Sequence, residues 1–284
     1  MAIFSNQATL TVNGNSTNSN IAYGEILDVL TATKTAVEGS YAPGETVTYA
    51  VALRNTGAAT LAGLTVTDNL GGFPFGTGTL YPLTYVDGSV TLFVNGVLQP
   101  TPAVTSTQPL VVSGISIPGS GDAVLVYQAV ANEFADPAAG GTIVNTATVT
   151  GDGLSAPITA TETVIVRTAP ALTITKSISP AQVVDNDRVT YTFVIQNTGN
   201  EPVVATDNAT ISDTFDPILT DLTVTYNGTA WTEGIQYNYD AATGLFTTVP
   251  SQITVPAATY TQDPVTGAYT VTPGTATLVV TGTI

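Results

Sequence analysis

One sequence unit occurs twice in this chain, and this duplication limits the possible folds more than any other feature. Four landmark pairs recur at spacings of 142, 142, 145 and 139 residues: Lys34 and Lys176, Asn55 and Asn197, Asp68 and Asp213, and Asn6 and Asn145. The surrounding letters also agree, as in TVTYAVALRNTG beside VTYTFVIQNTG. Because the chain of 284 residues is long enough for two ordinary domains, the duplication predicts two consecutive domains of one fold.

The repeated unit has the pattern of β-strands. In TVTYAVAL (46–53) and VTYTFVI (189–195), apolar residues stand at every second position, as in strands with one buried face. FVNGVL (93–98) and TYNGTAW (225–231) contain the Asn-Gly pair that is typical of a tight hairpin. No segment has convincing helical periodicity. We therefore expect an all-β fold with two tandem immunoglobulin-like β-sandwiches.

Composition argues against several functions. The formal charge is −16 with only five basic residues, which disfavours binding to nucleic acid or to an anionic membrane surface. The chain has no Cys and no His, so it lacks thiol nucleophiles, histidine acid–base catalysts and the usual zinc ligands. Its apolar runs are too short to cross a bilayer. We expect no cofactor, no metal, no membrane insertion and no enzyme that turns over a substrate.

The chain begins with a segment that matches the end of a repeated unit rather than its start. Residues 4–14, FSNQATLTVNG, match residues 143–153, IVNTATVTGDG, and this match places Asn6 on Asn145. The second unit runs to TATLVVTGTI without such a strand. The expected parts are a donor strand or hairpin over residues 1–30, a first sandwich over 31–166, and a second sandwich over 167–284 that lacks its closing strand.

The position of the N-terminal segment favours a contact with another copy. Residues 31–33 join it to the strand of Lys34, and three extended residues reach only about 10 Å. A sandwich with strands of a dozen residues is roughly 40 Å long. We therefore expect the segment to complete the second sandwich of a neighbouring copy, and repetition of this contact without ring closure gives an open fibre. The alternative is that residues 1–30 form a flexible or self-folded extension.

Several motifs resemble one known family. LTATKTAV, PGETVTYAVALRNTG, TVTDNL and GTIVNTATVTG, and in the second unit LTITKSISP, VTYTFVIQNTG and ISDTFD, resemble the conserved surface-protein repeat family called domain of unknown function 11. The resemblance covers nearly the whole chain. It implies an immunoglobulin-like fold in a bacterial or archaeal cell-surface or extracellular protein, and it implies no catalytic activity. The chain departs from the family by opening with the motif that normally ends a repeat.

A Lys, an Asp and an Asn on separate strands also resemble the residue set of domains with internal isopeptide bonds. A buried Lys is a neutral nucleophile, a buried protonated Asp polarises the Asn carbonyl, and packing holds the groups together. The products are an Asn–Lys amide and ammonia. The candidate sets are Lys34, Asp68 and Asn145 in the first sandwich, and Lys176, Asp213 and a neighbour's Asn6 in the second. The alternative is a plain Lys–Asp ion pair in each unit, with Asn145 bonding to backbone.

Two functions remain open at this stage. The first is a structural subunit of an extracellular filament that polymerises head to tail by donor-strand complementation, with Lys–Asn isopeptide bonds at the joints. The only two lysines of the chain occupy equivalent positions, which favours this hypothesis. The second is a monomeric, adhesin-like binding module of tandem surface domains. The first ten residues, MAIFSNQATL, lack the basic and apolar regions of a signal peptide. Either a signal peptide has been removed, or export uses another route, or the protein is intracellular, so the expected extracellular location rests on the resemblance alone.

Overall fold

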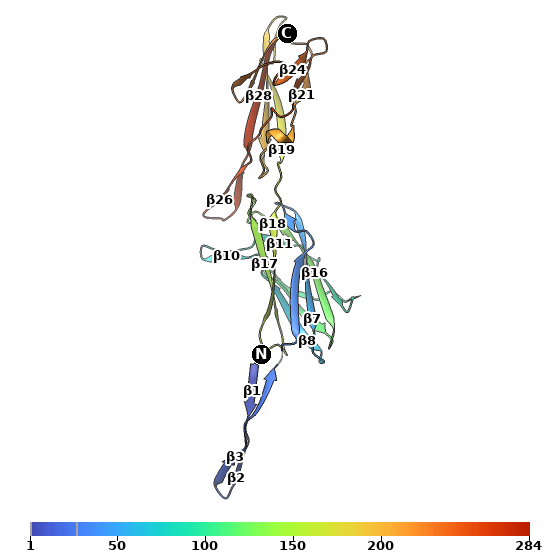
Figure 1. The fold of residues 1–284 in the computed structure, drawn as a ribbon, viewed down its shortest axis with the longest axis vertical. Coiled ribbons are helices and arrows are strands. Elements are labelled where there is room, and N and C mark those ends of the chain that lie inside the picture. Colours follow the sequence, from blue (N-terminus) through green and yellow to red (C-terminus); the bar gives the residue numbers. More distant parts are fainter. Residues whose placement is uncertain (1, 27) are drawn as a thin grey trace. The chain divides into compact units, whose positions relative to one another are not determined.

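The computed structural model describes residues 2–26 and 28–284, and nearly all regular structure in these ranges is β-strand (Figure 1). Within them, one turn of 3-10 helix at Ala205–Asp207 is the only helical element. The chain divides into two compact units. Gly141–Ile165 belong with the residues up to Asp136, and Pro137–Gly140 belong with Val166–Ile284. Each unit contains an immunoglobulin-like β-sandwich, which confirms the expected fold class.

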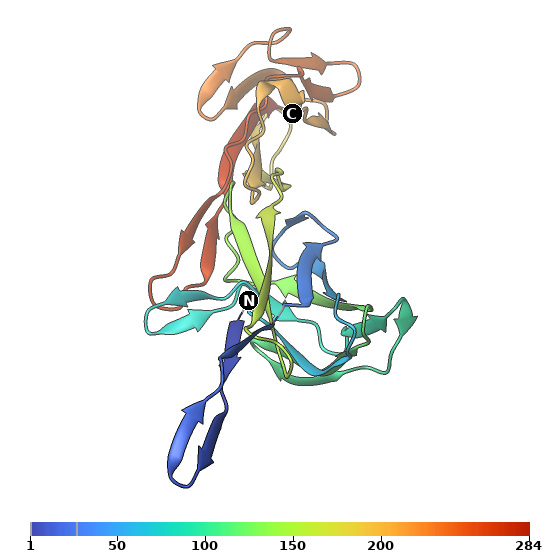
Figure 2. The same ribbon diagram turned by 60° about the horizontal axis from the view of Figure 1, so that its bottom comes forward.

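Residues 2–26 form a two-stranded antiparallel ribbon, here called the N-terminal hairpin (dark blue in Figures 1 and 2). Strand β1 (Ala2–Asn6) pairs with β4 (Ala22–Ile26), and β2 (Thr9–Val12) pairs with β3 (Asn15–Asn18). Asn13 and Gly14 make the turn at φ angles of 50° and 83°, the left-handed conformation that favours Asn-Gly. Leu27 lies outside the described residues.

The first sandwich has two fully developed sheets. One sheet has the strand order β13-β12-β16-β7-β5, and β11 also pairs with β16. Its strands are β5 (Leu30–Ala36), β7 (Thr46–Asn55), β11 (Leu83–Tyr85), β12 (Thr91–Val94), β13 (Val97–Leu98) and β16 (Asp122–Ala131). The facing sheet has the order β14-β15-β8-β17-β18-β6. Its strands are β6 (Ser40–Tyr41), β8 (Leu61–Asp68), β14 (Ala103–Thr107), β15 (Leu110–Ile117), β17 (Thr142–Thr150) and β18 (Ile158–Val166). A separate small hairpin joins β9 (Phe73–Phe75) and β10 (Gly78–Leu80).

The second sandwich repeats the first sheet and shortens the other. The order β19-β20-β28-β22-β23 matches β5-β7-β16-β12-β13. These strands are β19 (Leu172–Ser179), β20 (Arg188–Asn197), β22 (Thr220–Tyr226), β23 (Thr229–Trp231) and β28 (Gly274–Thr283). The facing sheet has three strands, β21 (Ser212–Thr214), β25 (Leu245–Thr248) and β24 (Tyr237–Asp240). A further hairpin joins β26 (Thr259–Gln262) and β27 (Tyr269–Thr272).

One difference between the two sandwiches concerns the strand edge beside the repeated Asp. Strand β8 lies between β15 and β17, whereas its counterpart β21 pairs with β25 alone within the described chain. Counterparts of β17, β18 and β6 are missing from the described second sandwich. The Asn-Gly hairpins predicted at residues 93–98 and 225–231 are confirmed in both units.

A buried asparagine closes the equivalent turn of each sandwich. In the second one, Asn197 donates from Nδ2 to the carbonyl oxygens of Glu201 (2.7 Å) and Pro256 (3.1 Å). Its Oδ1 accepts from the backbone N–H groups of Ala171 and Gly199, both at 2.9 Å. One side chain thus satisfies four backbone groups and joins the start of β19 to the end of β20.

We expect Asn197→Ala to lower the free energy of unfolding of the second sandwich by about 3 kcal/mol, because buried backbone groups lose their partners. Denaturant unfolding measures the change. Asn238→Ala is the matched control, since Asn238 is an exposed residue of the same sandwich. Equal stability of the two variants would contradict this role of Asn197.

Candidate functional site

The structure brings together the three residues predicted for the first sandwich, and each comes from a different strand. Lys34 lies on β5 opposite Val51. Asp68 is the last residue of β8, and Asn145 lies on β17, which pairs with β8. Strand β17 therefore covers the site and supplies one of its side chains.

A chain of hydrogen bonds connects the three residues. The Lys34 ammonium donates to Oδ2 of Asp68. The hydroxyl of Tyr127 donates to the same Oδ2 at 2.6 Å, and Nδ2 of Asn145 donates to the Tyr127 hydroxyl at 3.1 Å. Oδ1 of Asp68 accepts from the N–H of Leu70 at 3.0 Å. Asn145 thus lies within β17 and donates to a side chain, the hydroxyl of Tyr127. Under the ion-pair alternative, Asn145 was expected to bond to backbone.

The site is buried, and its electrostatics follow from this burial. The side chains of Lys34 and Asp68 are 0% and 1% exposed. Burial lowers the pKa of Lys34 to about 8, although the charges of Asp68 and Glu162 act in the opposite direction. Burial also raises the pKa of Tyr127 well above its usual value, so this phenol keeps its proton. A substantial fraction of Lys34 is therefore a neutral amine near pH 8.

Aromatic rings wall the site. Tyr49 and Tyr127 are stacked at a centroid distance of 5.5 Å. Nζ of Lys34 lies 4.9 Å from the Tyr49 centroid and 5.8 Å from the Tyr127 centroid. Oδ1 of Asn145 is buried without a hydrogen-bond partner among the described residues. An amine, a carboxyl and a carboxamide buried together are the groups that amide exchange requires.

The second sandwich has the same pair in a different environment. The Lys176 ammonium donates to Oδ2 of Asp213, and its Nζ lies 4.5 Å from the Tyr191 centroid and 5.3 Å from that of Phe215. The Lys176 side chain is 39% exposed, in contrast to the fully buried Lys34. The pair is therefore present but open to solvent.

The strand that carries Lys176 is uncovered along its length. Every residue of β19 is exposed, whereas β5 alternates buried and exposed positions. Leu172 is 48% exposed, and Leu30, its counterpart 142 residues earlier, is 3% exposed. Every second residue of β19 lies on the same side of the strand. One side, here called the open face, carries Leu172, Ile174, Lys176 and Ile178. In the first sandwich β17 contacts β5, and Leu30 and Lys34 on the equivalent side of β5 are buried.

The third residue predicted for the second site, Asn6, lies on β1 of the N-terminal hairpin. It pairs with Ala22 in the register of that hairpin. Phe4, Leu10 and Val12 of the same hairpin are large apolar residues with more than half of their surface exposed. The hairpin therefore presents apolar side chains that its own strands do not bury.

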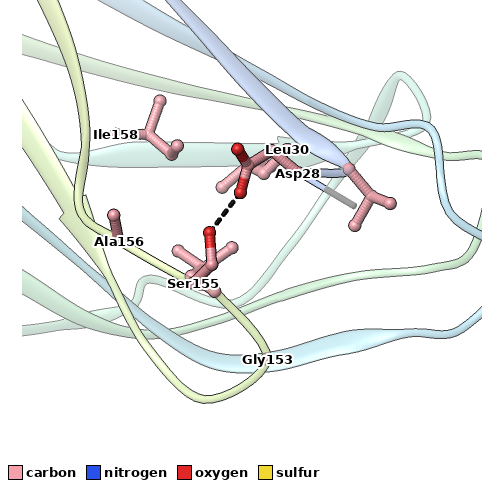
Figure 3. A pocket seen from close by; sticks show the side chains of 8 residues that line it. Asp28, Leu30, Gly153, Ser155, Ala156 and Ile158 are labelled. Carbon is pink, nitrogen blue, oxygen red and sulfur yellow. Dashed lines mark hydrogen bonds between the residues drawn. The ribbon is translucent and has the colours of Figure 1, made fainter. Parts of the chain in front are cut away.

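The segment before β5 is held at the turn between β17 and β18 (Figure 3). The Ser155 hydroxyl donates to Oδ1 of Asp28, and this hydrogen bond lowers the pKa of the Asp28 carboxyl. The carbonyl of Val29 accepts from the N–H of Thr56 at 2.7 Å. Leu30, Ser155 and Ile158 line the small hollow beside this hydrogen bond, so the start of β5 lies against the β17–β18 turn.

Tyr127 was not predicted from the sequence. The repeat comparison that identified the lysines could not identify it, because the residue opposite Tyr49 is Tyr127 whereas the residue opposite Tyr191 is Val280. Its only sequence signal is an inward position in the alternating strand DAVLVYQAVA, which is equally typical of a core residue.

Comparison with known proteins gives weak similarities. No family model matches the chain, so the resemblance to domain of unknown function 11 stays a prediction, and no curated protein matches it either. The chain is similar in structure to the pilus backbone protein of Streptococcus pneumoniae, with 13% identity and a TM-score of 0.32 over 86% of this chain and 56% of that one.

Two adhesin structures give similar values. The N-terminal domain of a Streptococcus gordonii adhesin has 14% identity and a TM-score of 0.34 over 55% of this chain and 36% of that one. The collagen-binding domain of a Staphylococcus aureus adhesin has 10% identity and a TM-score of 0.31 over 49% and 97%. Similarities this weak assign no function. Within the described residues, no helix is long and apolar enough to cross a membrane.

The lowered pKa of Lys34 predicts a pH dependence of stability. In Asn145→Ala, Lys34 keeps a free amine, and the unfolded chain binds more protons than the folded one between pH 8 and 10.5. Stability should therefore rise with pH through this window and lose this contribution as the pH falls toward 8. Urea unfolding of Asn145→Ala, compared with Lys34→Met/Asn145→Ala, isolates the effect. Parallel pH profiles of the two variants would contradict it.

Proposed function

We propose that the chain is a structural subunit of an extracellular filament, in which the N-terminal hairpin of one copy completes the second sandwich of the next. One observation carries this proposal. The open face of β19 is exposed in the second sandwich, whereas β17 covers its counterpart in the first. The occupant that fits this position is a strand with the pattern of β17, and the hairpin has this pattern.

The agreement extends to individual side chains. The inward residues of β17 are Ile143, Asn145, Ala147 and Val149, and all four are buried. The residues at the same places of the hairpin are Phe4, Asn6, Ala8 and Leu10. They alternate along the chain, so an extended segment presents all four on one side. Asn6 stands at the place of Asn145, and both segments have an apolar residue at each of the other three places.

The first sandwich also supplies the expected register. Ala147 lies opposite Asp68, and Val149 lies opposite Val66. The docked hairpin should therefore place Ala8 opposite Asp213 of the neighbouring copy. In this register β1 and β2 pair with the edge of β21 that has no partner in the described chain. β3 and β4 then take the place of β18.

Apolar burial and backbone pairing together would hold the joint. Phe4 is 57% and Leu10 is 63% exposed in the free hairpin. Full burial of each such side chain would contribute about 1.5–3 kcal/mol to the free energy of docking. Leu172 and Ile174 of the open face gain similar cover. New hydrogen bonds along the strand edge add to this, as in other cases of β-strand addition.

Docking would also create the missing chemistry. Asn6 would occupy the place of Asn145, and its strand would remove water from Lys176. Burial favours the neutral amine, which attacks the Asn6 carboxamide and releases ammonia. The resulting Lys176–Asn6 amide would make each joint covalent, and Lys34–Asn145 would crosslink each subunit internally. Each lysine reacts once, so the chain is no enzyme in the sense of turnover.

The contact joins two different surfaces of the same chain, so its repetition produces an open fibre. We place the filament at the cell surface or outside the cell, as the family resemblance suggests. A monomeric adhesin-like module is the alternative, and a purified chain that stays monomeric in solution would support it.

Deletion of residues 2–26 should abolish fibres in electron microscopy. Asn6→Ala should still form fibres, but boiling in detergent should dissolve them to monomers, because only the covalent bond is lost. Lys176→Ala should behave in the same way. Asn20→Ala is the control, since it alters an exposed amide of the same hairpin outside the strands. A boiled ladder that persists in Asn6→Ala excludes Asn6 as the acceptor.

A synthetic peptide of residues 2–12 should attach to the protein that lacks residues 2–26. The adduct should have the summed mass of the two minus one ammonia. The same peptide with Asn6→Ala should bind reversibly and leave no adduct, because it fills the open face without an acceptor. Mass spectrometry after denaturation separates the two cases. If neither peptide binds, another segment covers the open face and the proposal fails.

A further inference from the structure

We propose that the hydroxyl of Tyr127 relays a proton from Asp68 to the departing nitrogen of Asn145 when the Lys34–Asn145 bond forms. This inference rests on the isopeptide chemistry proposed above and assigns a residue that the Lys, Asp and Asn set does not include. It concerns only the site inside the first sandwich.

The geometry makes Tyr127 the connection between the acid and the leaving group. Its hydroxyl is 2.6 Å from Oδ2 of Asp68 and 3.1 Å from Nδ2 of Asn145. No hydrogen bond joins Asp68 directly to Asn145 among the described contacts. Oδ2 also accepts from Lys34. The same carboxylate oxygen therefore faces the nucleophile on one side and the phenol on the other.

The reaction balances with these groups alone. Asp68 first takes a proton from the Lys34 ammonium, and the neutral Nζ attacks Cγ of Asn145. In the tetrahedral intermediate Nδ2 is an amine with a lone pair. Tyr127 donates its proton to this lone pair and takes the proton of Asp68, so the bond between Cγ and Nδ2 breaks and ammonia leaves. The proton that Nζ loses on forming the amide returns to Asp68, which ends protonated.

The surroundings of Tyr127 suit a relay. Tyr127 is fully buried and stacks on Tyr49, so water does not replace it as a proton carrier. Burial disfavours the phenolate, so the hydroxyl passes a proton only while it receives another from Asp68. Its hydrogen bonds to Asp68 and Asn145 have the lengths that proton transfer requires.

The second sandwich has no equivalent phenol. Val280 occupies the register position of Tyr127 and is buried. The Lys176–Asn6 bond would therefore form without this relay, and the internal bond of each subunit would form faster than the bond between subunits.

Bond formation can be followed in the full chain made by cell-free translation, sampled over time by intact-mass spectrometry. All variants carry Asn6→Ala, so the loss of one ammonia reports only the Lys34–Asn145 bond. Tyr127→Phe keeps the ring and removes the hydroxyl, and we expect it to slow the loss by about 100-fold or more, a typical contribution of general acid catalysis. Tyr85→Phe is the matched control, because Tyr85 is also buried in the first sandwich and its hydroxyl has no partner among the described residues.

Each outcome has one meaning. If Tyr127→Phe reacts as fast as Tyr85→Phe, or if Tyr49→Phe is the slow variant, the relay through Tyr127 is wrong. If the parent itself loses no ammonia, the isopeptide chemistry is wrong. A fluorinated tyrosine at position 127 separates the relay from a role in folding, because it keeps the ring and hydroxyl but is more acidic. An unchanged rate with this residue would overturn the proposal.

Discussion

In each sandwich, the sheet that carries the lysine has an apolar face that another strand must bury, and the rest of the structure depends on which strand does so. In the first sandwich β17 contacts β5, and Leu30 is buried. In the second, the facing sheet ends at β21, and Leu172 on the equivalent strand remains half exposed. Exposed apolar side chains beside an unpaired strand edge favour the addition of another strand. The second sandwich is thus suited to accept one.

The burial of the lysine and the supply of the asparagine are coupled, because the same strand provides both. Strand β17 excludes water from Lys34 and carries Asn145 into the site. Desolvation lowers the pKa of the lysine, and the packed contact replaces a bimolecular encounter. Without the covering strand, Lys176 remains a solvated partner of Asp213. In the proposed filament, docking would therefore be the event that converts Lys176 into a nucleophile.

The sequence predicted the strands and the Lys–Asp pairs because each depends on a pattern that repeats along the chain. Alternation identified the strands, and the duplication identified Lys34 with Asp68 and Lys176 with Asp213 as equivalent pairs. Tyr127 could not be found in this way, because the second unit has Val280 at that place. The exposure of β19 also could not be predicted from its own letters. LTITKSIS alternates as well as LTATKTA does, and the difference arises from a strand that is distant in the sequence.

In the proposed chemistry, the two sites would react at different times. Asn145 belongs to the same chain as Lys34, so folding alone brings these residues together. Asn6 would reach Lys176 only from another copy, and that site has Val280 in place of the buried phenol. A subunit with this arrangement would complete its own crosslink before it joins a partner. The first sandwich would then already be rigid when its hairpin docks. The conformational entropy lost on docking would come from the hairpin and not from the sandwich.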